Sequence, residues 1–184
     1  MPDYTDIKEY AYRLGCTICL EFSPSWLEPS EFVRSLCQAD ECHNYGKNYM
    51  CPPYIGTLED IRQRLKRYNR AYLLQYTKPV DVRNDIPSLI KTKDDFHRII
   101  LELESFILKQ GAEEAWGLIG GNCGLCQPCR AVTGEPCAHP DRARPSLESL
   151  AINVQDLLAH FGITLEFKPD EITWTGCVLY ISVS

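Results

Sequence analysis

The sequence lacks any long hydrophobic run and any excess of positive charge. No stretch approaches the ~20 apolar residues that a membrane-spanning helix needs, and the first residues lack the basic and then apolar pattern of a signal peptide. Acidic residues outnumber basic ones, 25 to 19, for a net charge of −6. Phosphate-backbone binding depends on Lys and Arg. These absences argue against a membrane span and a nucleic-acid partner, and they predict a cytoplasmic protein.

Internal repeats and low-complexity segments are also absent. Nothing in the sequence resembles a catalytic nucleophile, an acid–base pair or a nucleotide-binding loop. A chain of 184 residues buries roughly 70% of its unfolded surface, so it does not need a metal merely to fold. We therefore expect a single domain over residues 1–184.

Helical and strand patterns interleave along the chain. They predict an α/β or α+β fold, with a mixed sheet of about five strands, flanking helices and two cysteine-rich cluster-binding loops. The surest helix has six apolar residues on one face: Phe96, Ile99, Ile100, Leu103, Phe106 and Ile107. The expected helices cover 3–15, 30–37, 57–68 and 93–110, and a helix or pair of helices is expected over 146–162. The expected strands cover 17–22, 71–75, 115–119, 163–167 and 173–183.

What the sequence does have is cysteine, ten residues in all. In a reducing compartment disulfides are rare, so cysteines that gather in groups are better explained as metal ligands. Cys123, Cys126, Cys129 and Cys137 form a C-x2-C-x2-C-x7-C motif. This resembles the bacterial ferredoxin run, which binds a [4Fe–4S] cluster, except that its last spacer is longer. Cys137 could therefore serve a different cluster. Zinc motifs usually pair two C-x2-C units across a longer gap.

A second group of cysteines precedes it. Cys37, Cys42 and Cys51 form C-x4-C-x8-C-P-P, and three thiolates would leave one iron of a cubane without a cysteine. That iron could take another cysteine (Cys16, Cys19 or Cys177), His43, water or a substrate. With His43, the same group would alternatively complete a Cys3His zinc site.

The other cysteines fit the protein core better. Cys16 and Cys19 lead into a strand, so one of them is expected in the core and the other is a spare ligand. Cys177 lies in an apolar strand, where cysteine is typically a small buried hydrophobe. A basic run follows the first motif, and it predicts either a solvated helix face or a docking surface for an acidic partner. It comprises Arg62, Arg64, Lys66, Arg67 and Arg70.

The two motifs occur with further short matches in a fixed order. These are Tyr45-Gly46, Cys51-Pro52-Pro53, the segment 121–126, Pro136-Cys137 and the segment 144–148. Together they resemble an uncharacterised prokaryotic family of "predicted metal-binding" proteins over roughly residues 30 to 180. The resemblance implies an iron–sulfur protein typical of anaerobes and archaea, and it supplies no reaction.

Three functional hypotheses follow. The first is an iron–sulfur redox protein whose two [4Fe–4S] clusters exchange electrons with a partner protein. The second is an enzyme whose three-cysteine cluster binds a small ligand or substrate at its open iron. The third is a binding module stabilised by zinc in one site.

Overall fold

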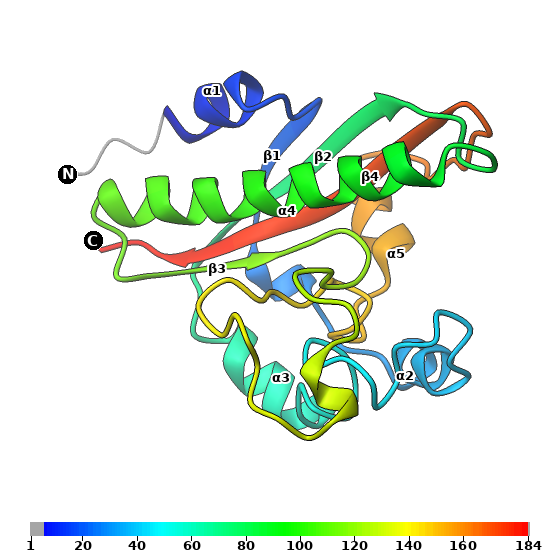
Figure 1. The fold of residues 1–184 in the computed structure, drawn as a ribbon. Helices are drawn as coiled ribbons and strands as arrows, with labels where there is room; N and C mark the ends of the chain where they lie inside the picture. The colour runs from blue at the N-terminus through cyan, green and yellow to red at the C-terminus, as the bar shows by residue number, and fades with distance from the viewer. Residues whose placement is uncertain (1–5, 184) are drawn as a thin grey trace.

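A four-stranded sheet with helices on both faces organises the chain in the computed structural model, which describes residues 6–183 (Figure 1). The strands are β1 (Ile18–Phe22), β2 (Arg70–Pro79), β3 (Glu114–Leu118) and β4 (Glu171–Ile181). The α-helices are α1 (Asp6–Arg13), α2 (Glu31–Gln38), α3 (Leu58–Leu65), α4 (Ile86–Lys109) and α5 (Val154–Ala159). Two short 3-10 helices are η1 (Pro24–Trp26) and η2 (Arg130–Val132).

The sheet has the strand order β1-β2-β4-β3, and every neighbouring pair is antiparallel. Its two long strands, β2 and β4, lie in the centre. Leu73 pairs with Cys177, and Trp116 pairs with Leu179. Successive side chains of a strand point to opposite faces, so the central strands contribute to two separate cores.

One core lies between the sheet and helices α1 and α4. The 24-residue helix α4 crosses this face (Figure 1), and all its predicted apolar residues are buried except Phe106, which is partly buried. The helix lies so close to β3 that a Cβ added at Gly117 would collide with Ile100. Glu104 of the helix accepts a hydrogen bond from the Gly117 N–H.

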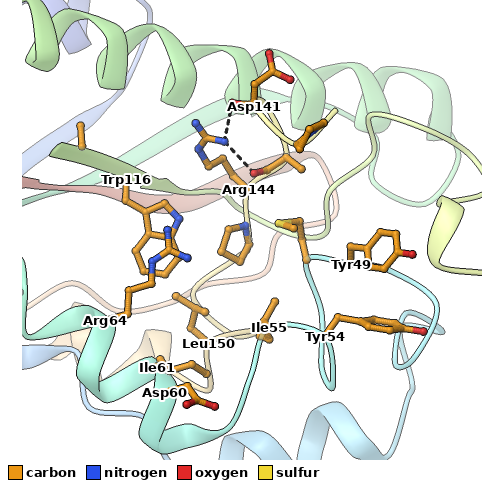
Figure 2. A pocket seen from close by; sticks show the side chains of 15 residues that line it. Tyr49, Tyr54, Ile55, Asp60, Ile61, Arg64, Trp116, Asp141, Arg144 and Leu150 are labelled. Carbon is orange, nitrogen blue, oxygen red and sulfur yellow. Dashed lines mark hydrogen bonds between the residues drawn. The ribbon is translucent and has the colours of Figure 1, made fainter. Parts of the chain in front are cut away.

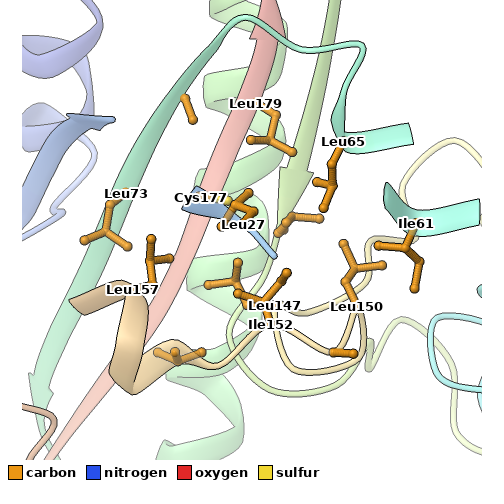
Figure 3. Packing of buried hydrophobic residues seen from close by; sticks show 14 of the residues in the cluster. Leu27, Ile61, Leu65, Leu73, Leu147, Leu150, Ile152, Leu157, Cys177 and Leu179 are labelled. Atoms are coloured by element: carbon orange, nitrogen blue, oxygen red, sulfur yellow. The ribbon is translucent and has the colours of Figure 1, made fainter. Parts of the chain in front are cut away.

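The second core covers the opposite face. Here Leu73, Cys177 and Leu179 of the sheet meet α3 and the segment 147–158 (Figure 3). α3 begins with the predicted capping box, since Thr57 and Asp60 exchange side-chain and backbone hydrogen bonds. This core therefore fixes α3 and the turn at 146–151, both of which border the cysteine loops.

Several sequence expectations need correction. The sheet is antiparallel with four strands, whereas a mixed sheet of about five was expected. Residues 163–167 form no strand: the Ile163 N–H donates to Leu158 O and closes α5, and Phe167 is 86% exposed. The helix expected over 146–162 is a series of turns followed by the short α5, and α4 starts seven residues earlier than expected, capped by Asp85. Residues 3–5 of the first expected helix lie outside the described residues.

Candidate metal centre

The two cysteine loops lie together beyond the edge strand β3. The chain that follows β3 runs to the region between α2 and α3 (Figure 1), where it meets the loop after α2. The N-terminus of α2 is attached to the turn at 146–151, because the Ser30 N–H donates to Ala151 O at 2.9 Å. Ser30 is at the N-cap, although its side chain makes no capping hydrogen bond. Cys37 lies in the last turn of this helix.

The three cysteines of the first motif line one cavity of about 310 Å³. Among the residues that the structure describes, no fourth cysteine lines it. Its other walls come from both loops and from the turn at 146–151. They are Asn44, Gly121, Asn122, Ser146, Glu148 and Ser149. Cys37 Sγ also lies 3.6 Å from the backbone oxygen of Glu148. The three cysteines that the sequence motif groups therefore lie at one cavity, and their role as ligands stays a prediction.

Burial favours the protonated form of two thiols in the first cavity, those of Cys37 and Cys51. The pKa of Cys51 is raised to about 12, mainly by burial and to a smaller extent by the neighbouring thiols Cys42, Cys37, Cys123 and Cys129. Burial also raises the pKa of Cys37, and the guanidinium of Arg34 partly offsets this rise. A bound cation would reverse the preference, because metal binding replaces the thiol protons. The influence of Cys123 and Cys129 on Cys51 also shows that the two motifs are neighbours.

Arg34 is an unusual buried residue beside this cavity. Only 8% of its surface is exposed, and its Nε and Nη2 are buried with no hydrogen-bond partner among the described residues. It stands one helical turn before Cys37, on the same face of α2. A buried charge without a partner is costly. Two such donors are suited to an anionic partner.

The second motif forms a neighbouring cavity. Cys123, Cys126 and Cys129 line a space of about 410 Å³. Cys137 does not line it, although its thiol is near enough to raise the pKa of Cys123, as does Cys126. The main cause of that raised pKa is burial, and the backbone N–H groups of Leu125 and Arg144 oppose it by donating toward the sulfur. Such donors are typical second-shell partners of a thiolate.

Asparagine side chains separate the two cavities. Asn44 and Asn122 line both, and Asn122 Nδ2 donates to Asn44 Oδ1 at 3.2 Å. Asn48, which is 3% exposed, donates from Nδ2 to the backbone oxygen of Cys123 at 2.9 Å. Lys93 of α4 donates to Asn122 Oδ1 at 3.0 Å. These bonds join the first loop, the second loop and α4 into one structure, which we call the asparagine wall.

Comparison with known families gives a match that includes both loops. The sequence pattern of the family described as "Predicted metal-binding protein (DUF2284)" matches residues 21–180. The chain belongs to this family. The comparisons with curated proteins and with solved structures gave no match. Membership supports metal binding in general and names neither the metal nor a reaction.

The remaining cysteines of this predicted metal-binding protein lie in its two cores. Cys16 and Cys19 pack on the α1 and α4 side of the sheet, and Cys177 packs on the other side. Burial raises the pKa of Cys16 and Cys19 to about 12, and it raises that of Cys177 as well. None of the three lines either cysteine cavity. His43, considered above for the first group, lines the second cavity.

Over residues 6–183, no three His, Cys, Asp or Glu side chains are grouped as a site for a single metal ion. In the same residues, no helix has the length and hydrophobicity to cross a membrane.

The basic run near α3 is largely paired within the chain. Arg62 binds Glu28 at 2.7 Å, Arg67 binds Glu114 and Arg70 binds Glu21. Arg64 instead lies over the ring of Trp116, with its guanidinium carbon 3.5 Å from the ring centroid. Three of these five basic residues are therefore neutralised locally, which weakens the idea that the run as a whole docks an acidic partner.

Proposed function

We propose that this protein is an iron–sulfur redox protein that binds two [4Fe–4S] clusters, one through each cysteine motif. The observation that carries the proposal is that each motif contributes three cysteines to a cavity of its own and that the two cavities share the asparagine wall. Two crowded sets of thiols at adjacent cavities suit clusters held by thiolates better than isolated structural cysteines.

The residues divide into two ligand sets. Cys37, Cys42 and Cys51 would hold the first cluster. The second would be held by Cys123, Cys126 and Cys129, with Cys137 as the fourth ligand. When bound, such clusters supply one-electron chemistry, at potentials set by nearby hydrogen bonds, charge and solvent exposure. The unpaired donors of Arg34 and the N–H groups near Cys123 are the groups of this chain that would adjust those potentials.

Electron exchange with a partner protein is the role that this arrangement supports best. The cavities are adjacent, so an electron could pass between the two sites. Cys42 is exposed and the thiols of the second motif are partly exposed, so a docked partner could approach both. The proposal also includes a cytoplasmic location and a single iron–sulfur domain for this chain.

Metal and sulfide analysis of anaerobically purified protein tests it. We expect about eight irons and eight acid-labile sulfides per chain, because each motif would hold one cubane. Roughly four irons would leave one cluster and contradict the assignment of the other motif. Stoichiometric zinc without sulfide would favour the zinc-stabilised module instead.

A second candidate is an enzyme whose first cluster binds a small ligand. The observation in its favour is that only three cysteines line the first cavity within the described chain. An iron without a thiolate ligand would be open to water, small anions or the carboxylate of Glu148. Mild oxidation should then give a [3Fe–4S] EPR signal from the first site, and added cyanide should change the spectrum of that cluster alone. If neither happens, the electron-transfer role is favoured.

A further inference from the structure

A third cavity, larger than either cysteine cavity, lies on the other side of the first loop. Its volume is about 480 Å³, within the range of small-molecule sites. α3, β3, the loop at 49–55 and the loop at 140–145 surround it (Figure 2). Met50, the residue before Cys51, is part of its lining. No cysteine of either motif lines it.

Much of the cavity wall is apolar. Ile61 comes from α3, Ile55 from the loop that precedes this helix, and Leu150 from the turn at 146–151 (Figure 2). Two prolines of the loop at 140–145 contribute further apolar surface. A ligand that enters would therefore bury an apolar body, which is the usual source of small-molecule affinity in such sites.

All but one of the charged groups of the lining are either paired within the chain or directed away from the cavity. Arg144 binds both carboxylate oxygens of Glu104 at 2.8 Å and also two backbone oxygens. Asp60 is used by the capping box with Thr57. Figure 2 shows the carboxylate of Asp141 at the edge of the cavity, directed away from it.

Arg64 is that exception. It lies on the ring of Trp116 and interacts with the hydroxyl of Tyr68, but it has no carboxylate partner within the described residues, unlike three neighbours in the same basic run. Stacking fixes the plane of a guanidinium while its N–H edge remains able to bind a carboxylate in a bidentate manner. The cavity thus combines apolar walls with one cation that has no carboxylate partner among the described residues.

We propose that this cavity binds a small organic anion with a flat apolar body, of the aromatic carboxylate class. Arg64 would bind the carboxylate, and the walls formed by Ile55, Ile61 and Leu150 would cover the ring. The position of Met50 places such a ligand one residue along the chain from a cysteine of the first motif. The proposal concerns binding, and it does not depend on which metal the cysteine loops hold.

Calorimetric titration of the full, anaerobically purified protein with three probes tests the proposal. Benzoate has both the ring and the charge, benzyl alcohol has the ring alone, and acetate has the charge alone. We expect benzoate to bind about tenfold or more tightly than either of the others, because a charge-assisted hydrogen bond and apolar burial act together. Quenching of Trp116 fluorescence provides a second measure. Metal content is determined on the same sample, so a failure of the cluster proposal is recognised separately.

Variants make the test specific. Arg64→Gln should weaken benzoate binding about tenfold or more and leave benzyl alcohol binding unchanged. Lys66→Gln removes the same charge just after the same helix, from a residue that does not line the cavity, and should leave both unchanged. Circular dichroism confirms folding. Absence of benzoate binding, equal binding of all three probes, or equal benzoate affinity in Arg64→Gln and the unaltered protein would overturn the proposal.

Discussion

Replacing Arg34 by methionine should change stability in opposite directions with and without the cofactor. Nε and Nη2 of Arg34 are buried without partners among the described residues. An unsatisfied buried group costs about 1–3 kcal/mol, and more when it is charged. Methionine keeps the apolar stem and removes these donors. The metal-free Arg34→Met variant should therefore be more stable by about 1–3 kcal/mol.

The loaded protein should respond in the other direction. If thiolate-held clusters are bound beside Cys37, the guanidinium donates charge-assisted hydrogen bonds worth about 1.5–3 kcal/mol. Their loss should lower the stability of the loaded variant and speed the loss of iron to a chelator. For a chain of this length, each kcal/mol corresponds to roughly 2–4 °C in Tm.

Thermal unfolding followed by circular dichroism measures both forms, with the loaded protein kept anaerobic. Arg98→Met provides a control, since Arg98 is an exposed residue of α4 that pairs with Glu102 and Asp95. It should shift Tm little, and equally in both forms. If Arg34→Met changes the two forms by the same amount and sign, the guanidinium does not face the bound group. If it destabilises the metal-free form, Arg34 has a partner in solution.

Three further predictions concern the cysteines. Cys126→Ala should lose the second cluster and loosen its loop, while Cys177→Ala should keep its iron and lose about 1 kcal/mol of stability. Iron analysis and chemical unfolding distinguish the two variants. Loss of iron from Cys177→Ala would contradict the place of Cys177 in the core. The pKa of Cys51 lies at about 12 in the fold against 9.0 in the unfolded chain. The fold thus favours the neutral thiol, and this stabilisation of the metal-free protein is complete below pH 9 and lost between pH 9 and 12. Cys51→Ala should therefore lose less stability than the unaltered protein between pH 8 and pH 10.5 in urea unfolding; an equal loss would show that Cys51 ionises freely. Finally, iodoacetamide at pH 8 should modify the exposed Cys42 in the metal-free protein well before the buried Cys19. Peptide mass spectrometry measures both rates of modification. Equal rates would mean that the core opens.

Elements defined by local patterns were predictable from the sequence. The apolar face of α4 repeats at helical spacing, and the capping box at Thr57 and Asp60 is encoded within four residues. The wrong strand at 163–167 has a physical explanation. Its residues alternate between apolar and polar as those of a strand would. However, the Ile163 N–H donates to Leu158 O at the end of α5, and the sheet ends at β1 on one side and at β3 on the other, without this segment. Alternation alone cannot reveal whether a neighbouring strand is available.

The candidate site was predictable only within each motif. Close spacing brings Cys37, Cys42 and Cys51 to one cavity, so the sequence sufficed there. It could not predict the partners of the motifs, because these come from distant segments. Asn48 meets Cys123 across 75 residues. Arg34 could have been noticed from its helical spacing to Cys37, but its burial depends on the packing of α2 against the rest of the chain.

The asparagine wall has a consequence for how the cofactors would be loaded. Asn48 supports the backbone at Cys123, and Asn44 supports Asn122, so each loop is part of the scaffold on which the other is ordered. Binding of a cluster to one loop would therefore reduce the conformational entropy that the other loop loses when it binds its own cluster. We expect loading to be close to all-or-none. At half-saturating iron and sulfide, native mass spectrometry should find empty and fully loaded chains, with far fewer half-loaded ones than independent sites would give.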